Sequence, residues 1–200
     1  LPIGTRPDCI SDEILDLIHN HTKKYHVWLE YGLQSIHDRT LQLINRGHDF
    51  RSFQDAVSRT KLKGNIKICA HIILGLPGEN RDDMMETART VSSMGIDAIK
   101  LHHLYVAKKT AMADKYLKGD IKTLKMEEYV PLVCDFLERI SPEIVIQRLV
   151  GDTHGDFLIS PVWNVTKGEV FAAITNELKK RNSYQGAKYT PCATLEIEKI

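Results

Sequence analysis

One junction between a strand and a helix carries side chains that could hold a nucleoside and a carboxylate. In WLEYGLQS, Gln34 and Ser35 follow an apolar stretch, and an amide can both donate to and accept from sugar hydroxyls. Farther along, the guanidinium of Arg46 could grip a carboxylate through two parallel hydrogen bonds. Taken singly, Gln34 could cap its own turn and Arg46 could satisfy the end of a helix. Because ligands of parallel α/β sheets bind where strands end and helices begin, we interpret the pair as a cofactor site.

The run HIILGLPGE forms a second junction, with a tight turn at 75–79 directly after an apolar stretch. Glycine permits a close approach to the backbone, so a flat base could lie against this strand end, although a simple turn needs the same residues. The helix that follows GLPGEN could instead offer its N–H groups to a phosphate. The chain would then be an α/β-barrel enzyme that binds a nucleotide or phosphate, but no GxGxxG or Gly-Lys-Ser/Thr signature is present.

Histidines raise the possibility of a metal site. His71, His102 and His103 fall on expected strands and could converge, since histidine is the commonest nitrogen ligand. No spacing requires a metal there, and single histidines on strands are more often structural. His154, in GDTHGD, has no stronger claim. We therefore predict no metal ligand among these residues.

Composition limits the broad class of protein. A chain of 200 residues with 42% hydrophobic residues can bury one real core. The 27 basic and 26 acidic residues nearly cancel, which argues weakly against an RNA-docking module and gives no support to a membrane surface. We expect a cytoplasmic protein, with contact to nucleic acid left open. The four cysteines have no metal or redox spacing, and they stand at Cys9, Cys69, Cys134 and Cys192.

Strand and helix signals alternate around these residues, which predicts a parallel sheet with right-handed crossovers, as in a barrel or partial barrel. We expect residues 1–150 to form barrel, 151–188 to form an extension that packs on it, and 189–200 to be a polar tail. Leu1–Ile3 is interpreted as the tail of a strand that begins upstream. Strands are expected at 26–33, 66–74, 98–105 and 143–150, and helices at 11–24, 38–46, 51–64, 80–94, 110–118 and around 130–140 and 170–178.

Several longer runs together resemble the radical SAM superfamily. They are IGTRPDC, WLEYGLQSIHDRTLQLINRGHDF, HIILGLPGE, EEYVPLVCDFLE and SYQG, in this order over nearly the whole chain. The pattern is similar to the coproporphyrinogen-oxidase-like and Elongator-like branches, and most of all to the YhcC-like group. The resemblance implies the C-terminal part of a partial (β/α)6 TIM-like barrel.

The resemblance also implies roles for individual residues. Gln34 matches the glutamine that reaches the ribose of S-adenosylmethionine (SAM), with Ser35 beside it. Arg46 matches the arginine that holds the methionine carboxylate. The strand-end positions that border adenine are matched by Ile73 and Gly75, and by Leu104, Tyr105 and Val106.

Two departures qualify what the resemblance implies. His71 stands where related enzymes carry an aspartate that binds ribose, and no group of three cysteines is present for the [4Fe–4S] cluster. We expect the cluster ligands upstream of Leu1, so this piece alone should be inactive. The complete protein is expected to accept an electron from a donor, generate a 5′-deoxyadenosyl radical and abstract hydrogen from a substrate that the sequence does not identify.

Overall fold

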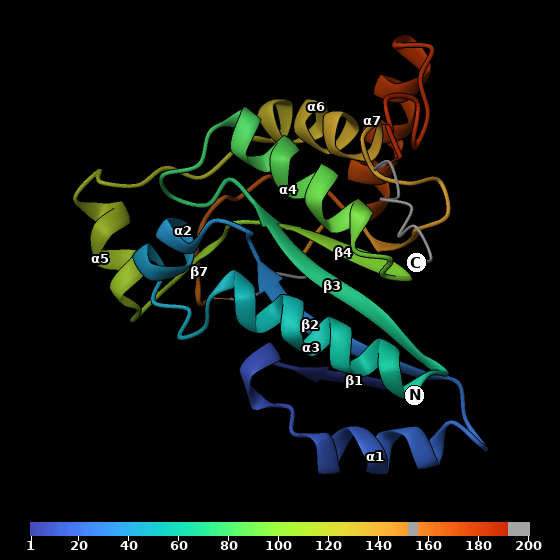
Figure 1. Ribbon diagram of the computed structural model, residues 1–200. Helices are drawn as coiled ribbons and strands as arrows, with labels where there is room; N and C mark the ends of the chain where they lie inside the picture. The colour runs from blue at the N-terminus through green and yellow to red at the C-terminus, as the bar shows by residue number, and fades with distance from the viewer. Residues whose placement is uncertain (152–155, 192–200) are drawn as a thin grey trace.

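A five-stranded parallel sheet forms the centre of the computed structural model, which describes residues 1–151 and 156–191 (Figure 1). Every neighbouring pair in the sheet is parallel, as the alternation of strands and helices predicts. The predicted α/β class is therefore confirmed. In spatial order the strands are β1 (Pro2–Thr5), β2 (Val27–Gln34), β3 (Ile66–Leu74), β4 (Ala98–His103) and β6 (Val145–Arg148).

Helices follow the strands and bury one face of the sheet. On this face Tyr31 of β2 donates or accepts a hydrogen bond with Thr60 Oγ1 at 2.8 Å and meets the ring of Phe53 edge-on. Because side chains alternate along a strand, Glu30 and Gly32 point to the opposite face, which we call the inner face. The helices are α1 (Asp12–His21), α2 (Asp38–Leu43), α3 (Phe50–Lys63), α4 (Arg81–Ser93), α5 (Ala111–Leu117), α6 (Met126–Leu137) and α7 (Lys167–Lys180), and a 3-10 turn spans Pro7–Cys9.

Local capping signals explain where the helices begin. Ser11 accepts a hydrogen bond from the backbone N–H of Ile14 and starts α1 as predicted. Asn80 and Asp83 form a reciprocal capping box at the start of α4. Within the two described ranges, no helix has both the length and the apolar character needed to cross a membrane.

Several expected elements have other bounds in the structure, and two of these differences affect the candidate site. The helix expected over 38–46 ends at Leu43, because Asn45 adopts a left-handed conformation with φ 53°. The N–H of Arg46 then donates to the carbonyl of Leu41 at 2.8 Å, which together with the Asn45-to-Gln42 bond closes the helix in a Schellman motif. Arg46 therefore lies in the turn after α2 rather than at a helix end.

The strand expected over 98–105 ends two residues early. β4 ends at His103, and the next two residues separate it from β5 (Val106–Ala107). β5 pairs antiparallel with β7 (Leu158–Ser160) in a small second sheet. This antiparallel pair was not predicted, because strands of two and three residues are too short to show a periodic pattern.

Candidate functional site

A hollow of about 470 Å³ opens at the carboxyl ends of β2, β3 and β4. This is the edge of the sheet at which the α2 and α5 helices lie (Figure 1). Five of the residues predicted to bind a cofactor line the hollow, and they come from all three strand ends. The lining residues are Gln34, His71, Ile73, His102, His103, Leu104, Tyr105, Ala107, Thr110 and Met112.

Gln34 reaches the hollow through an unusual backbone. Its φ is 73°, and the register between β2 and β3 shifts between Gly32 and Gln34, so the strand bulges at its end. A left-handed conformation is costly for a residue with a side chain and is concentrated at functional sites. A bulge also redirects side chains. In the described part of the chain, the Gln34 amide is not engaged by any hydrogen bond.

Arg46 and Gln34 meet over Gly32. Arg46 Nη2 donates to the Gly32 carbonyl at 2.9 Å. A Cβ atom built on Gly32 would lie 2.4 Å from Arg46 Nη2 and 3.0 Å from Gln34 Nε2. The absence of a side chain at Gly32 is therefore what allows the guanidinium and the amide to occupy neighbouring positions.

The Arg46 guanidinium has unused hydrogen-bonding capacity. Its Nε is buried and has no partner among the described residues. Burial lowers the pKa of Arg46, and the charge of Arg6 lowers it further, but a guanidinium remains protonated at neutral pH. A buried donor without a partner is unfavourable, and an anionic ligand would supply one. Arg46 stands beside the hollow and does not line it.

Ser35 and Gly75 do not line the hollow, and both pack within the protein instead. The buried Ser35 hydroxyl donates to Glu79 Oε1 and accepts from the His37 N–H at 3.0 Å, which ties the end of β2 to the GLPGE turn. Gly75 has φ 81°, and a Cβ there would lie 2.7 Å from Leu124 Cδ1. Neither residue therefore reaches the hollow.

Val106 is also placed away from the hollow. Its side chain is fully buried and packs with Ala113 and Ile121 in the small core beneath α5. The two residues before it, which were also predicted to border adenine, do line the hollow: they are Leu104 and Tyr105, and Tyr105 is 42% exposed. Val106 begins β5, beyond the end of β4, and its side chain enters this small core instead of the hollow.

An ionic network lies on the inner face, below the hollow. Glu30 Oε2 accepts from Lys100 Nζ at 2.5 Å and from His71 Nε2 at 2.9 Å. Burial, the largest single effect, raises the pKa of Glu30, but the hydrogen bonds from Lys100 and His71 outweigh it and the net pKa is lowered. Burial lowers the pKa of His71 despite the nearby carboxylate. At neutral pH the network is thus a Lys100–Glu30 ion pair with a neutral His71.

Glu30 and Lys100 were missed as site residues. Each is a charged residue between two apolar neighbours in its strand, and each has little exposed side chain, 9% for Glu30 and 14% for Lys100. A buried charge inside a strand requires a partner, and that is the signal that identifies such residues. His71, predicted at a ribose-binding position, lines the hollow from above this network.

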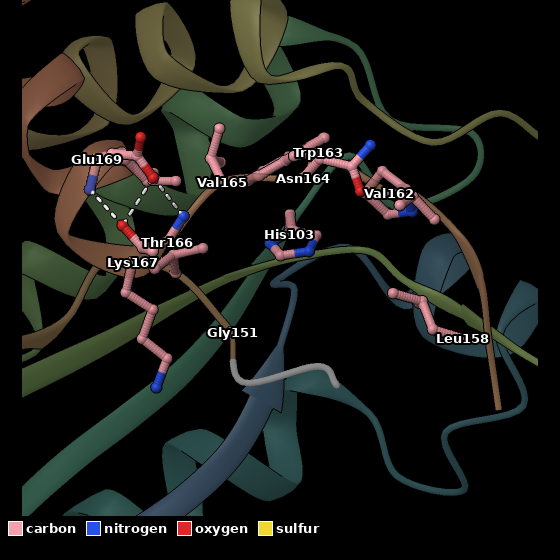
Figure 2. Close-up of a pocket in the computed structure, with 13 residues that line it drawn as sticks. His103, Gly151, Leu158, Val162, Trp163, Asn164, Val165, Thr166, Lys167 and Glu169 are labelled. Carbon is pink, nitrogen blue, oxygen red and sulfur yellow. Dashed lines mark hydrogen bonds between the residues drawn. The ribbon is translucent and has the colours of Figure 1, made fainter. Parts of the chain in front are cut away.

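His102 and His103 have strongly lowered basicity. Burial lowers the pKa of His103 to about 4, and burial together with the charges of His71 and Arg148 lowers that of His102 to about 4. The His103 ring lies 4.2 Å from the Trp163 ring and 5.6 Å from the Tyr129 ring, between centroids. Figure 2 shows His103 facing the segment that carries Trp163, in a second pocket of about 520 Å³.

The histidines on the strands do not form a metal site in the described residues. His71 and His102 stack with ring centroids 5.7 Å apart, and the group of potential ligand atoms found within 4.8 Å of one another is elsewhere, at His37, Asp83 and Glu86. There the Asp83 carboxylate already bonds Arg39 and the Asn80 N–H. His154 lies outside the described residues.

The described cysteines are poorly suited to binding iron. Cys9 is exposed, whereas Cys69 and Cys134 are buried and free. Burial raises the pKa of Cys69 to about 12 and that of Cys134 to about 11, and metal ligands are thiolates. Cys192 lies outside the described residues. The three that are described come from separate elements and do not form a set of cluster ligands.

Comparison with known families covers most of the chain. Residues 1–91 match the radical SAM superfamily, and residues 96–180 match the radical SAM C-terminal domain. The uncharacterized protein YtqA of Bacillus subtilis (strain 168) is 45% identical over 186 residues, which are 93% of this chain and 58% of YtqA. Protein YhcC of Escherichia coli (strain K12) is 38% identical over 164 residues, 82% of this chain and 53% of YhcC.

A solved structure shows the same fold. The archaeal Methanocaldococcus infernus Elp3 with an N-terminal deletion superimposes with a TM-score of 0.80 at 22% identity, covering 92% of this chain and 42% of that one. The chain thus spans little more than half the length of the two curated relatives above.

Proposed function

This chain belongs to the radical SAM superfamily, and we propose that it is the SAM-binding part of a radical SAM enzyme. The adjacent family matches over 1–91 and 96–180 and the identity to YhcC support this assignment. The predicted resemblance to the YhcC-like group agrees with the identity to YhcC, and the predicted relation to the Elongator-like branch agrees with the fold shared with Elp3.

The convergence of Gln34 and Arg46 over Gly32 carries the proposal. Both groups lie at the carboxyl edge of a parallel sheet, where ligands of such sheets bind. In the proposed complex the Gln34 amide bonds the ribose hydroxyls, and Arg46 pairs with the methionine carboxylate. The volume of the adjacent hollow falls in the range of cofactor pockets.

Apolar side chains complete the proposed SAM site. Ile73, Leu104 and Tyr105 line the hollow next to Gln34, and their surfaces can cover the adenine ring and exclude water from it. His71 donates to Glu30, which fixes its ring orientation at the floor of the hollow. We propose that His71 takes the place of the family's ribose-binding aspartate.

The [4Fe–4S] cluster does not fit the cysteines of the described residues, so we assign none of them to it. We propose that its ligands lie on a segment upstream of Leu1 in a longer polypeptide. When bound there, the cluster would supply the electron that converts SAM to methionine and the 5′-deoxyadenosyl radical, which abstracts hydrogen from substrate. The residues of this chain would hold SAM and keep water and other hydrogen donors away.

The alternative of a phosphate site at GLPGEN is disfavoured by the start of α4. The Asn80 side chain already accepts from the N–H groups of Asp82 and Asp83, and both of these residues place acidic side chains in the first turn. Negative charge at a helix N-terminus opposes binding of another anion.

Anaerobic SAM cleavage tests the proposed function. The full-length protein, reconstituted with iron and sulfide and reduced with dithionite, should convert SAM to 5′-deoxyadenosine and methionine. The same preparation without reductant is the control. A reconstituted, reduced protein that binds SAM but releases no 5′-deoxyadenosine would overturn the assignment of radical chemistry.

A further inference from the structure

The inner face of the sheet carries more positive than negative charge beside the proposed SAM site. In the register of β4 and β6, Lys100 and Arg148 are paired positions on the same face. Lys100 is bound by the Glu30 carboxylate, whose Oε2 atom also accepts from His71. The carboxylate of this network is therefore already engaged by two donors.

Arg148 has no such partner. Across residues 1–151 and 156–191 its guanidinium makes no hydrogen bond and no ion pair, although the residue is half-buried. It does not line the hollow but lies one strand away from it, paired with Lys100 in the register of β4 and β6, and its charge, after burial and the charge of His71, contributes to lowering the pKa of His102. His102 lines the hollow, and its Nε2 is buried without a partner in the described part of the chain.

An anion should stabilise an unpaired, partly buried guanidinium more than it stabilises the guanidinium of a surface arginine. A partly desolvated charge is destabilising unless it is paired and hydrogen-bonded, and the cost grows when a bound ligand closes the site to water. Arginine is also the side chain best shaped to bind carboxylate or phosphate through two parallel hydrogen bonds. By contrast, Arg89 on α4 is exposed to solvent.

We propose that Arg148 binds an anionic oxygen group of the substrate, a carboxylate or a phosphate, on the inner face next to the SAM hollow. This inference rests on the proposed function, because it places the substrate beside the cofactor that would act on it. The neutral His102 ring offers a further polar contact, and the Lys100–Glu30 pair forms the adjacent wall. The substrate class is thus a molecule with at least one carboxylate or phosphate near the hydrogen that is abstracted.

Anion titrations of the full-length protein test the inference. Inorganic phosphate and succinate are titrated separately into protein saturated with SAM, at an ionic strength held constant with chloride, and the midpoint of thermal unfolding is followed. A saturable rise is expected for at least one of the two anions, because a ligand of the folded state stabilises it. The anion that gives the rise distinguishes a phosphate from a carboxylate as the substrate group.

Three variants make the test specific to Arg148. Arg148→Gln should weaken the apparent anion affinity at least about tenfold, the loss expected for a charge-assisted hydrogen bond. Arg148→Lys should retain part of the response, since it keeps the charge without the bidentate fork. Arg89→Gln, the matched control on α4, should respond as the parent does.

SAM affinity, measured by calorimetry on the same samples, separates this inference from the proposed function. If the parent protein binds SAM and Arg148→Gln binds it equally well but responds to anions as the parent does, the inference is wrong and the proposed function stands. The inference is equally wrong if neither anion stabilises the parent. If the parent does not bind SAM at all, the proposed function itself fails.

Discussion

At the residue scale, the proposed SAM site depends on a position that has no side chain. Gly32 separates Glu30 from Gln34 along β2, and its missing Cβ leaves room for the Arg46 guanidinium. The sequence predicts Gln34 at a strand end and Arg46 at the end of the next helix. It does not show that they meet, because their meeting depends on the bulge between Gly32 and Gln34 and on the left-handed Asn45 that ends α2.

Gly32→Ala should therefore disturb both proposed SAM contacts at once. The added Cβ would lie 2.4 Å from Arg46 Nη2, so the guanidinium must move. We expect SAM affinity to fall at least about tenfold, since one charge-assisted hydrogen bond alone contributes that much. Calorimetric titration measures it. Gly4→Ala in β1 is the control, because a Cβ at Gly4 meets nothing within 4 Å, and equal SAM affinity in the two variants would contradict the geometry described here.

His103 should make stability depend on pH. Its pKa is lowered to about 4 from an ordinary value of 6.5, so between these values the unfolded chain binds a proton that the folded protein does not. The free energy of unfolding should then fall as pH drops from about 6.5 to about 4, by about 3 kcal/mol for this group, and should be unaffected by it above pH 7.

Comparison with His103→Phe isolates this contribution. The variant keeps an aromatic ring between Tyr129 and Trp163 but cannot titrate, so other groups such as His71 affect both proteins alike. Urea unfolding at several pH values should show a smaller loss of stability in the variant as pH falls. Parallel pH profiles in the two proteins would show that His103 does not carry the effect.

At the element scale, the best-predicted features are those with strong local signals. β3 occupies 66–74 as expected, because a mainly apolar run, interrupted only by Lys67 and His71, ends there at a turn glycine. α1 begins after Ser11 because its hydroxyl caps the helix. The β5–β7 pair could not be predicted, since its two strands are short and lie far apart in the sequence.

The turn after β3 gives a test of element packing. Gly75 has φ 81°, and an added Cβ would lie 2.7 Å from Leu124 Cδ1. Gly75→Ala should therefore carry the cost of left-handed backbone, about 1–2 kcal/mol, together with about 1–3 kcal/mol for the steric conflict. Chemical denaturation measures the sum.

Gly119→Ala is the matched control for this substitution. Gly119 has nearly the same φ, 83°, but nothing lies within 4 Å of an added Cβ, so only the backbone cost is expected. Combining Gly75→Ala with Leu124→Ala should recover part of the steric cost. If the two glycine variants lose the same stability, the contact with Leu124 has no energetic importance.

At the scale of the whole molecule, the chain carries the proposed SAM contacts without a set of cluster ligands among its described residues. It covers 58% of YtqA and 53% of YhcC, which agrees with the proposal that the iron ligands belong to a longer polypeptide. Parallel pairing in the five-stranded sheet follows from the alternation of strands and helices, and the order of its strands is that of the predicted partial barrel. The network of Glu30, His71 and Lys100 does not, because it depends on which inner-face residues the sheet register aligns.

Iron content tests this division of roles. The polypeptide of residues 1–200, reconstituted anaerobically with iron and sulfide and desalted, should retain no stoichiometric iron, since its buried thiols have raised pKa values. The full-length protein treated identically should retain about four iron atoms per chain, as a [4Fe–4S] cluster requires. Four tightly held iron atoms on residues 1–200 would show that these residues supply cluster ligands after all.

Binding of SAM to Arg46→Ala and Gln34→Ala is the most direct test of the central claim, that these two side chains hold one SAM molecule. Calorimetry on the full-length protein should show at least about tenfold weaker affinity for Arg46→Ala and a smaller loss for Gln34→Ala. The double variant should lose less than the sum, as expected for groups that share a ligand. Arg51→Ala on α3 is the control and should bind as the parent does. Parent-like SAM affinity in both single variants would contradict the account.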